Sequence, residues 1–367
     1  MVKLGEVCLI NPKSCTLRDD TEVSFIPMTK VGEHGEFDAS EIKNYSEVKK
    51  GFTNFQNGDI LFAKITPCME NGKGAIAHNM KNGIGFGSTE FHVLRPDTDK
   101  ITSEWLYYLT TWKAFRKEAE RNMTGSAGQK RVPKTFLENY VVNLPDIDTQ
   151  KSENKILRKV DDFIFLRKQQ LAKLDELVKA RFVEMFGDPV SNPMGWKRVR
   201  FDSISENLDS KRVPVTESDR KEGVYPYYGA SGIVDWINDY IFDEDILLVS
   251  EDGANLLMRS TPIAFSVSGK SWVNNHAHVV RFHDFATQKF IEVYFSLIDI
   301  SEYITGTAQP KLNQAKLNTM LFCWPPLSLQ KQFAAFVERV DKQKQTVQQS
   351  LEKLELMKKA LMQEYFG

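Results

Sequence analysis

The residues of this chain that could do catalytic chemistry fall short of the motifs they resemble. Gly269-Lys270-Ser271 matches the end of a phosphate-binding loop, but Ala264 stands where that motif requires a glycine. A nuclease needs clustered carboxylates with a nearby lysine, whereas Glu41-Ile42-Lys43 has no clear partner acids. That tripeptide is better explained as a solvated strand or loop. We therefore expect neither nucleotide hydrolysis nor nuclease chemistry.

Two further kinds of site are also incomplete. A DNA methyltransferase is expected to contain a glycine-rich cofactor loop and an Asn-Pro-Pro-aromatic tetrapeptide, but Asn11-Pro12-Lys13 and Asn192-Pro193-Met194 both depart from it at the third position. His276 and His278 alternate along a predicted strand and could ligate a metal from one face. Ordinary strand histidines are several times commoner. We therefore predict no catalytic residue and no metal site.

Two glycine-rich loops carry the residue types that bind phosphate. The first, 121–131, combines a flexible backbone with hydroxyl, amide and cationic groups, and the second, 305–311, has the same character. Backbone N–H groups and Arg or Lys side chains are the usual phosphate ligands. One such loop is more often a solvated turn, but its recurrence in both halves of the chain favours a shared binding role. The residues expected to bind are Arg121, Ser126, Gln129, Lys130, Arg131, Lys134, Thr307, Gln309, Lys311 and Lys316.

Within these loops, Lys130, Arg131 and Lys311 are expected to hold phosphates rather than to read bases, because the loops are similar in both halves of the chain. Residues that read bases should instead differ between the two halves of the chain if the halves bind different sequences. The formal net charge of −1 does not exclude a nucleic-acid ligand. Net charge describes the whole surface, whereas phosphate binding needs only one concentrated basic face.

The chain consists of two copies of one unit. Residues 155–161 are echoed by 335–341, and Met185-Phe186-Gly187 by Tyr365-Phe366-Gly367, each pair lying 180 positions apart. Farther upstream the likeness weakens, but its order holds. Each copy is therefore a variable globular part followed by a similar C-terminal segment.

The repeated segment has the spacing of a coiled-coil helix. Asp148 and Ser328 are candidate N-caps, and Arg167, Lys344 and Lys358 interrupt the apolar seam. Two such helices in one chain predict antiparallel pairing, although each helix could instead pack on its own domain. The seam residues are Leu157, Val160, Ile164, Leu171, Leu174 and Val178 in the first copy and Val337, Val340, Val347, Leu351, Leu354 and Leu361 in the second.

The globular parts predict a mixture of strands and helices. Short apolar runs after polar turns indicate buried strands, and amphipathic runs indicate helices. The expected strands are 59–64, 245–250, 265–268 and 276–282, and the expected helices are 102–119 and 287–303.

Composition is that of a globular protein, with 41% apolar and 26% charged residues. No apolar run approaches the ~20 residues needed to span a membrane, and the N-terminal stretch lacks the features of a signal peptide. We therefore expect a cytoplasmic protein without a membrane partner. The cysteines form no Cys-x-x-Cys pair, which predicts buried, reduced thiols rather than disulfides or zinc ligands; they are Cys8, Cys15, Cys68 and Cys323.

Several segments together resemble the specificity subunit of type I restriction–modification systems. They are 62–73 in the first copy and 227–232, 250–255 and 269–276 in the second, together with the repeated helix that ends in Phe-Gly. None of these segments would be specific alone, but the resemblance runs along the whole chain. Within them, we expect DNA contacts from Lys64, Lys73, Asn274, Asn275 and His276.

The resemblance implies a mixed α/β (α+β) fold with two similar target-recognition domains separated by two long, antiparallel coiled-coil helices, with pseudo-twofold symmetry. The boundaries we expect are 1–145 for the first recognition domain, 146–190 for a central spacer helix, 191–326 for the second recognition domain and 327–367 for a C-terminal spacer helix.

The resemblance also implies a non-catalytic subunit that reads a split, asymmetric site in double-stranded DNA. Its partners would be two methyltransferase subunits and, for cleavage, two restriction subunits. S-adenosylmethionine, ATP and Mg²⁺ would serve those partners, and this chain would hold no cofactor. Two other functions remain open: a coiled-coil protein–protein scaffold with two peptide-binding domains, and the recognition part of a fused methyltransferase.

Overall fold

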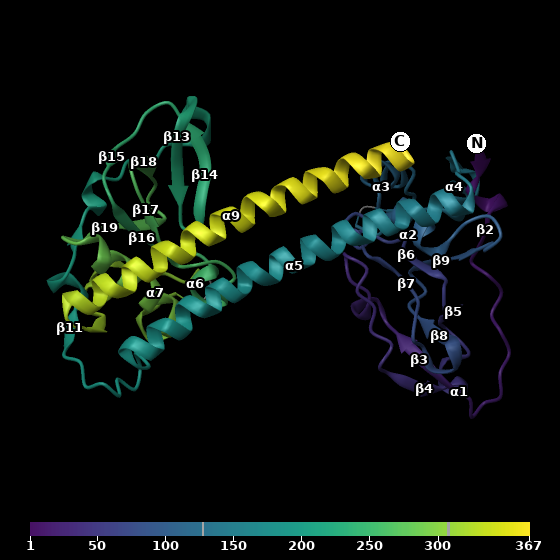
Figure 1. Ribbon diagram of the computed structural model, residues 1–367, viewed down its shortest axis with the longest axis horizontal. Helices are drawn as coiled ribbons and strands as arrows, with labels where there is room; N and C mark the ends of the chain where they lie inside the picture. The colour runs from purple at the N-terminus through teal and green to yellow at the C-terminus, as the bar shows by residue number, and fades with distance from the viewer. Residues whose placement is uncertain (127, 307–308) are drawn as a thin grey trace. The chain divides into compact units, whose positions relative to one another are not determined.

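The computed structural model describes residues 1–126, 128–306 and 309–367 and divides into two compact units (Figure 1). Unit 1 comprises Met1–Leu166 with Leu351–Gly367, and unit 2 comprises Arg167–Ser350. Each unit therefore contains one globular domain, the beginning of the long helix that follows it and the end of the other long helix. The two units therefore contain the same kinds of element. The long helix that begins in one unit is the one that ends in the other.

The domain of unit 1 contains two four-stranded sheets and one short strand pair. Strand β6 lies inside the first sheet, which explains its uninterrupted burial and confirms the strand predicted at 59–64. The first sheet, in the order β2-β9-β6-β7, consists of Cys8–Ile10, Phe91–Pro96, Ile60–Ala63 and Gly74–Ile76. The second sheet, in the order β4-β3-β8-β5, consists of Ile42–Asn44, Glu22–Ile26, Ile84–Gly87 and Thr53–Gln56. The strand pair consists of Val2–Lys3 (β1) and Val141–Val142 (β10).

The domain of unit 2 repeats this plan strand by strand. The predicted strands at 245–250, 265–268 and 276–282 are confirmed as β16, β17 and β19. The first sheet, in the order β12-β19-β16-β17, consists of Glu206–Asn207, Ala277–Arg281, Ile246–Ser250 and Ala264–Val267. The second sheet, in the order β14-β13-β18-β15, consists of Gly232–Ile237, Glu222–Gly229, Lys270–Val273 and Phe242–Asp243. The strand pair consists of Arg198–Arg200 (β11) and Leu321–Cys323 (β20).

Gly269-Lys270-Ser271, which resembled a phosphate-binding loop, begins strand β18 rather than a helix. Gly269 has φ +75° and turns the chain into that strand. The structure therefore supports the sequence argument that this tripeptide is not a nucleotide site.

Short helices cover the sheets of both domains, and one of the predicted helices is interrupted. The segment 102–119 forms two helices because Trp112 between them has extended backbone angles, φ −61° and ψ 128°. Buried Arg116 donates hydrogen bonds to the carbonyl oxygens of Thr110 (2.8 Å) and Met69 (2.6 Å), which ties the break to the neighbouring loop. The short helices are Tyr45–Val48 (α1), Ser103–Thr111 (α2), Lys113–Arg121 (α3), Lys134–Asn139 (α4), Asn255–Met258 (α6), Phe285–Leu297 (α7) and Gln314–Thr319 (α8).

The two long helices are α5 (Ile147–Phe186) and α9 (Leu327–Phe366), each of 40 residues. The N-cap predictions were wrong. Asp146 rather than Asp148 begins α5, because its Oδ1 accepts hydrogen bonds from the N–H groups of Asp148 (3.0 Å) and Thr149 (2.9 Å). Ser328 already lies inside α9.

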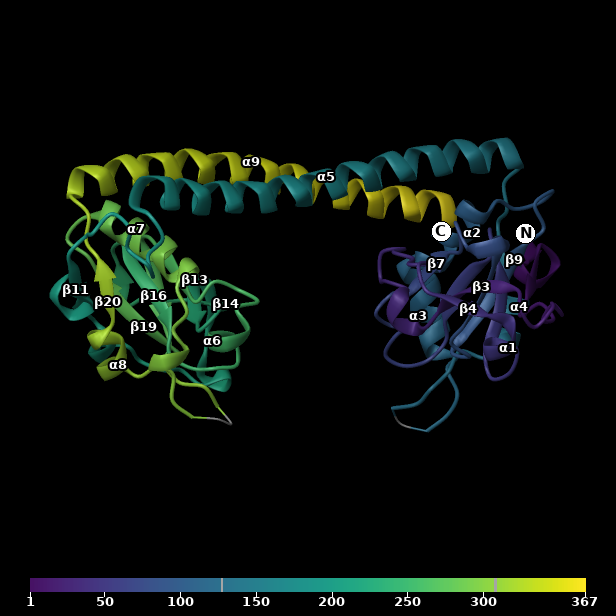
Figure 2. The same cartoon turned by 90° about the horizontal axis from the view of Figure 1, so that it is seen from below.

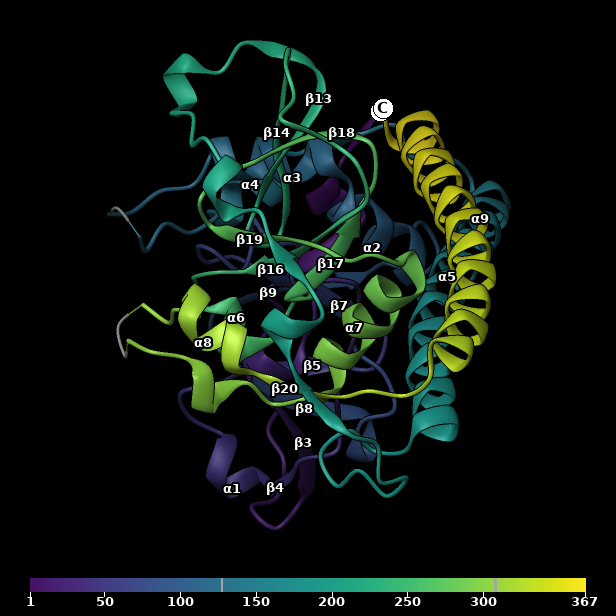
Figure 3. The same cartoon turned by 90° about the vertical axis from the view of Figure 1, so that its left-hand side faces the viewer.

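The helices pair antiparallel within each unit, as predicted. In unit 1, Asp161 of α5 forms an ion pair with Lys358 of α9 at 2.5 Å. In unit 2, Asp175 pairs with Lys344, and the rings of Phe182 and Phe333 lie 5.5 Å apart. Residue numbers therefore rise along one helix as they fall along the other. Figures 2 and 3 show both helices side by side along one flank of the domain of unit 2.

The charged residues that interrupt the predicted seam have partners on the opposite helix. Besides the two lysine–aspartate pairs, Arg167 donates a hydrogen bond to Ser350 at 3.2 Å. The apolar seam residues are buried or half-buried around them; the most buried are Leu157, Val160, Leu174, Val178, Val337, Val340, Val347 and Leu351. The interruptions therefore belong to the pairing and do not break it.

Equivalent contacts fix the helices on both domains. Buried Gln150 donates to the carbonyl oxygen of Pro145 at 2.9 Å, and buried Gln330 donates to that of Pro325 at 2.9 Å. At the other helix ends, Phe366 lies 4.8 Å from Trp105 in unit 1, and Phe186 lies 4.9 Å from Phe290 in unit 2. The repeated Phe-Gly ending thus packs each long helix onto the domain that belongs to the other repeat.

All four cysteines are free, and only Cys8 and Cys323 are buried. Burial raises the pKa of the Cys8 thiol to about 12. Cys15 and Cys68 are half-buried, so the expectation of buried thiols holds for two of the four.

Candidate nucleic-acid interface

The two glycine-rich loops are hairpins with the same closure. In the first loop (124–131), Thr124 and Arg131 exchange backbone hydrogen bonds of 2.9 and 2.8 Å. In the second loop (305–311), Thr305 and Lys311 exchange two of 2.8 Å. Residue 127 of the first loop and residues 307–308 of the second, including the predicted contact Thr307, lie outside the described residues. Within each unit, the loop lies at the end of the domain away from the long helices (Figure 2).

Both loops leave their hairpin beside the end of an equivalent strand, β6 in unit 1 and β16 in unit 2. After the first loop, the N–H of Val132 donates to the carbonyl oxygen of Lys64 at 2.9 Å, just beyond β6. After the second loop, the N–H of Leu312 donates to the carbonyl oxygen of Glu251 at 2.8 Å, just beyond β16. The sheets therefore set the position of both loops, and the sequence similarity between the loops reflects a shared backbone geometry.

Arg131 is held at the base of the first loop by a carboxylate. Its Nε and Nη2 atoms each donate a hydrogen bond of 2.9 Å to Glu90, and its Nη1 atom donates to the carbonyl oxygen of Gln129 at 3.1 Å. The hydrogen bond from Arg131 lowers the pKa of Glu90 and raises that of Arg131, so both stay charged. Arg131 thus anchors the loop, and its predicted phosphate contact remains a prediction.

Lys311 is held in the equivalent place by a different carboxylate. Its Nζ atom lies 3.1 Å from Glu251 Oε1. Glu251 also accepts a hydrogen bond of 2.7 Å from Arg212. Burial raises the pKa of Glu251, but the hydrogen bond from Arg212 and the neighbouring positive groups lower it overall. The second loop is therefore fixed by a carboxylate shared between two cations.

A histidine fixes the exit of the first loop. His92 Nε2 donates to the carbonyl oxygen of Val132 at 2.8 Å, and its Nδ1 accepts from the amide of Asn11 at 2.9 Å. Burial is the main cause that lowers the pKa of His92, and the charge of Lys64 adds to it. His92 is therefore neutral near pH 7.

The equivalent histidine of unit 2 faces two oxygen acceptors. His278 Nε2 lies 2.7 Å from the carbonyl oxygen of Leu312, and its Nδ1 lies 2.6 Å from Asp209. Burial would raise the pKa of Asp209, yet the hydrogen bond from His278 and its charge lower it overall. The repeat is thus preserved at the level of single hydrogen bonds, with an aspartate where unit 1 has Asn11.

Asp209, Glu251 and His278 are the one group within the described residues whose ligand atoms lie close enough together to hold a metal ion. Arg212 already lies 3.4 Å from Asp209 and 2.7 Å from Glu251. A cation bound there would meet this guanidinium, so the acids are explained by internal charge balance. The group gives no support for a metal site.

Several predicted contacts have partners inside their own unit. Lys73 donates to the carbonyl oxygen of Met28 at 3.2 Å, and Lys134 pairs with Glu138 along α4 at 3.0 Å. Asn274 is only 7% exposed and accepts the N–H of His276 at 2.8 Å. These contacts give Lys73 and Asn274 a structural role, because their polar groups face the protein.

Other predicted contacts are exposed on or beside the loops. Among the predicted contacts that the structure describes, the exposed side chains without an ion pair are Arg121, Ser126, Gln129, Lys130, Asn275, Gln309 and Lys316. His276 is half-exposed, and Asp252 holds its Nδ1 atom at 2.9 Å, which leaves Nε2 directed away from that carboxylate. Lys64 is half-buried at the end of β6. These groups are free to meet phosphates or base edges.

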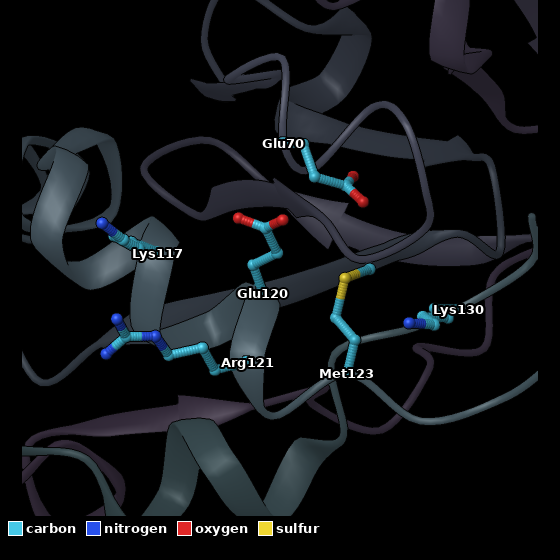
Figure 4. Close-up of a pocket in the computed structure, with 6 residues that line it drawn as sticks. All are labelled: Glu70, Lys117, Glu120, Arg121, Met123 and Lys130. Carbon is cyan, nitrogen blue, oxygen red and sulfur yellow. The ribbon is translucent and has the colours of Figure 1, made fainter. Parts of the chain in front are cut away.

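A cleft beside the first loop was not anticipated from the sequence. It encloses about 280 Å³ and is lined by Glu70, Lys117, Glu120, Arg121, Met123 and Lys130 (Figure 4). Glu70 comes from the loop after β6, three residues come from α3, Met123 lies between α3 and the first loop, and Lys130 belongs to that loop. Only Arg121 and Lys130 were predicted. The high charge of α3 was a usable signal, but the partner wall at Glu70 is distant in sequence.

The structure defines a protein of two equivalent domains, each presenting a polar, partly basic loop at its end away from the long helices. The chain belongs to the family described as type I restriction modification DNA specificity domain, whose model matches residues 1–176 and 193–356. The two matched stretches correspond to the two copies of the internal repeat. Among the helices that the structure describes, none is both long and apolar enough to cross a membrane.

Curated relatives carry the same family name. The chain is 48% identical over 158 residues to the type I restriction enzyme EcoAI specificity subunit of Escherichia coli, and this covers 42% of the chain and 26% of that protein. It is 44% identical over 147 residues to the EcoEI specificity subunit of the same species, covering 39% of the chain and 24% of that protein. The matches therefore span only about a quarter of the length of these relatives.

Solved structures share the fold along almost the whole chain. The type I restriction–modification S subunit from M. genitalium has a TM-score of 0.60 at 13% identity, covering 100% of this chain and 95% of that one. A chain from a structure of the assembly and conformational transition of a type I system has a TM-score of 0.56 at 16% identity, covering 99% and 96%. At this identity the likeness concerns the fold alone.

Proposed function

We propose that this chain is the DNA-sequence-recognition subunit of a type I restriction–modification enzyme and catalyses no reaction itself. One observation carries the proposal. Two loops of identical closure, anchored through Arg131 and Lys311, occur in two domains whose surrounding residues differ. Similar loops suit the phosphate backbone, which is the same everywhere, and different surroundings suit two different base sequences. The family membership supports the same conclusion.

The DNA site is therefore proposed to be split and asymmetric, with one half read by each domain. Exposed Lys130 in unit 1 and Lys316 in unit 2 are the phosphate contacts that need no rearrangement. Arg131 and Lys311 supply positive charge beside them while holding the loops. Base contacts come from side chains that differ between the units, including Asn275 and His276.

Docking of partner subunits is proposed for the long helices. In unit 1, α5 exposes large apolar side chains at Phe163 (54%), Phe165 (60%) and Leu166 (54%), and α9 exposes Leu356 (67%). Apolar side chains on paired helices are typical of surfaces that bind further helices. We propose that methyltransferase subunits bind there and that restriction subunits join through them. S-adenosylmethionine, ATP and Mg²⁺ then belong to those partners.

The test is a methylation assay with purified components. The chain alone should transfer no methyl group and cut no DNA, whereas the chain with its methyltransferase subunit and S-adenosylmethionine should methylate one split site. Sequencing of methylated bases in a host with and without the gene identifies that site. Methylation or cleavage by the isolated chain would contradict the non-catalytic role.

The same experiment separates the two alternative functions. A coiled-coil scaffold with peptide-binding domains would bind the partner subunits without giving them any sequence preference. If the chain were the recognition part of a fused methyltransferase, it would support methylation only when a catalytic domain is joined to it in one polypeptide. We favour neither, because the equivalent basic loops have no explanation in a peptide-binding scaffold.

A further inference from the structure

The cleft beside the first loop contains carboxylates that nothing in the described part of the chain neutralises. Glu120, at the end of α3, has no ion pair and no side-chain hydrogen bond there, and Glu70 accepts only the hydroxyl of Thr66 at 2.8 Å. In Figure 4 the Glu120 carboxylate points from its helix toward the loop that carries Glu70, whose carboxylate lies on the side of Met123. This contrasts with Glu90 at the base of the same loop, which is fully paired with Arg131.

Unpaired cations line the same cleft. Within the described residues, Lys117, Arg121 and Lys130 form no ion pair with either glutamate, although all line the cavity. Met123 adds an apolar surface between the carboxylates and Lys130 (Figure 4). The cleft therefore combines two hydrogen-bond acceptors, three cations and one apolar side chain, all at the end of the domain that carries the proposed DNA-binding loop.

The phosphates of DNA repel a carboxylate. A carboxylate at a DNA interface is therefore favourable only if it accepts a hydrogen bond from the DNA. In the major groove, guanine presents N7 and O6 acceptors and thymine presents an O4 acceptor. Adenine presents its N6 amino donor, but the neighbouring N7 acceptor repels a carboxylate. Cytosine presents its N4 amino donor with no acceptor of its own in that groove. Cytosine is therefore the base that suits this site best.

We propose that Glu120 reads a cytosine in the half-site bound by unit 1, by accepting a hydrogen bond from its N4 amino group. Lys117 and Lys130 hold the flanking phosphates and offset the charge of the carboxylates. Glu70 lines the opposite wall of the cleft. The proposal rests on the DNA-recognition function proposed above and adds the chemical class of one base that the site selects.

The corresponding segment of unit 2 is built differently. There the chain enters the second loop through a short 3-10 turn at Ser301–Tyr303 in place of α3. The cleft residues that belong to α3 thus have no equivalent helix before the second loop. A reading residue that belongs to one unit alone is what an asymmetric site requires.

The experiment uses the full chain assembled with its methyltransferase subunit and a randomised duplex pool. Wild type should prefer cytosine at one position of one half-site by about tenfold or more. Glu120→Ala, which removes the acceptor, should lose that preference at this position and keep the preferences at all others. Glu118→Ala is the matched control, because Glu118 lies on the same helix but outside the cleft, and it should read the wild-type site.

A second measurement avoids any effect of the substitution on folding. The cytosine at the affected position is replaced by a pyrimidin-2-one nucleoside, which lacks the N4 amino group. Wild type should bind this duplex about tenfold more weakly, whereas Glu120→Ala should not distinguish the two duplexes. Unchanged selectivity of Glu120→Ala at every position, or an equal loss on all duplexes, overturns the proposal. Absence of any sequence preference in wild type would instead overturn the proposed function itself.

Discussion

Arg131 and Lys311 occupy the same position in the two units, and each is neutralised by a carboxylate from a different strand end. Arg131 pairs with Glu90, which directly precedes β9, at 2.9 Å. Lys311 pairs with Glu251, which directly follows β16, at 3.1 Å. The backbone of the two loops is thus fixed in the same way while the charges around them are arranged differently. This combination suits two domains that bind the same backbone and different bases.

Arg131→Ala should weaken DNA binding on all sequences alike. The substitution removes one positive charge from the loop end, so the slope of log affinity against log salt should fall by about one. Affinity is measured against salt concentration on the cognate duplex and on single-mismatch duplexes. Loss of discrimination at one base pair alone would show that Arg131 reads a base.

The double variant Arg131→Ala with Glu90→Gln distinguishes the two origins of that effect. Glu90→Gln removes the carboxylate that Arg131 neutralises. Recovery of the salt slope in the double variant assigns the loss to an uncompensated Glu90. A slope that stays low assigns it to a direct phosphate contact of Arg131. Lys130→Ala, which removes an exposed and unpaired cation, should lower the slope without recovery by Glu90→Gln.

Unit 1 should lose stability in mild acid because of His92. Burial is the main cause that lowers the pKa of His92 below its ordinary value of 6.5, so the unfolded chain binds a proton more readily than the folded chain. The penalty is absent well above pH 6.5 and grows as the pH falls below that value. His92→Gln, whose amide can still donate to the Val132 carbonyl oxygen, should flatten this dependence. Urea unfolding at pH 7 and pH 5 measures it, and an equal decline in both proteins would contradict the role of His92.

Lys358 and Asp161 should contribute a small coupling energy to helix pairing. Both side chains are about one-third exposed, at 33% and 34%, so solvent screens their attraction. A double-mutant cycle with Lys358→Ala and Asp161→Asn should give a coupling of about 0.5 kcal/mol. Tyr108 donates to Asp161 at 2.9 Å and remains as a partner when the lysine is removed. A coupling near zero would mean that the lysine is only a solvated interruption of the seam.

Phe366→Ala should destabilise unit 1 although it lies one residue from the end of the chain. Its ring packs 4.8 Å from Trp105 and 6.4 Å from Trp112. Replacing a fully buried large aromatic side chain by alanine lowers the free energy of unfolding by about 3 kcal/mol. Because Phe366 is half-buried, Phe366→Ala should lower it by less than Phe186→Ala does at the buried position in unit 2. Tryptophan fluorescence during denaturant unfolding reports the change. An unaltered midpoint for Phe366→Ala would show that the helix end does not hold the domain.

Much of the fold followed from local pattern. The buried strands around Ile60 and Ile246 and the long helices follow from hydrophobic spacing between neighbours in the chain, and the repeat follows from matching segments 180 positions apart. Such spacing can be measured in the sequence directly. Helix ends and breaks were less predictable. The break at Trp112 depends on buried Arg116, whose contact with Met69 crosses 47 positions.

The candidate site shows the same division. Glycine-rich segments with several cations were visible in the sequence, and the structure placed them as equivalent loops. The sequence could not show which cations were free. Lys130 and Arg131 are neighbours of similar charge, but only Arg131 meets a carboxylate, and that carboxylate lies 41 positions away. The acceptors of the cleft, Glu70 and Glu120, were missed for the same reason.

By itself, therefore, the sequence determined that this protein is two copies of one unit with two basic loops, and it predicted that the two long helices pair. Repeats, periodicity and composition can be found by comparing segments of the sequence, without knowing which residues meet in space. Only the tertiary structure decided which charges are neutralised, which remain exposed and which line the cleft. Ion pairs and clefts join residues that the fold brings together from separate strands and helices, and their energies depend on distance and burial.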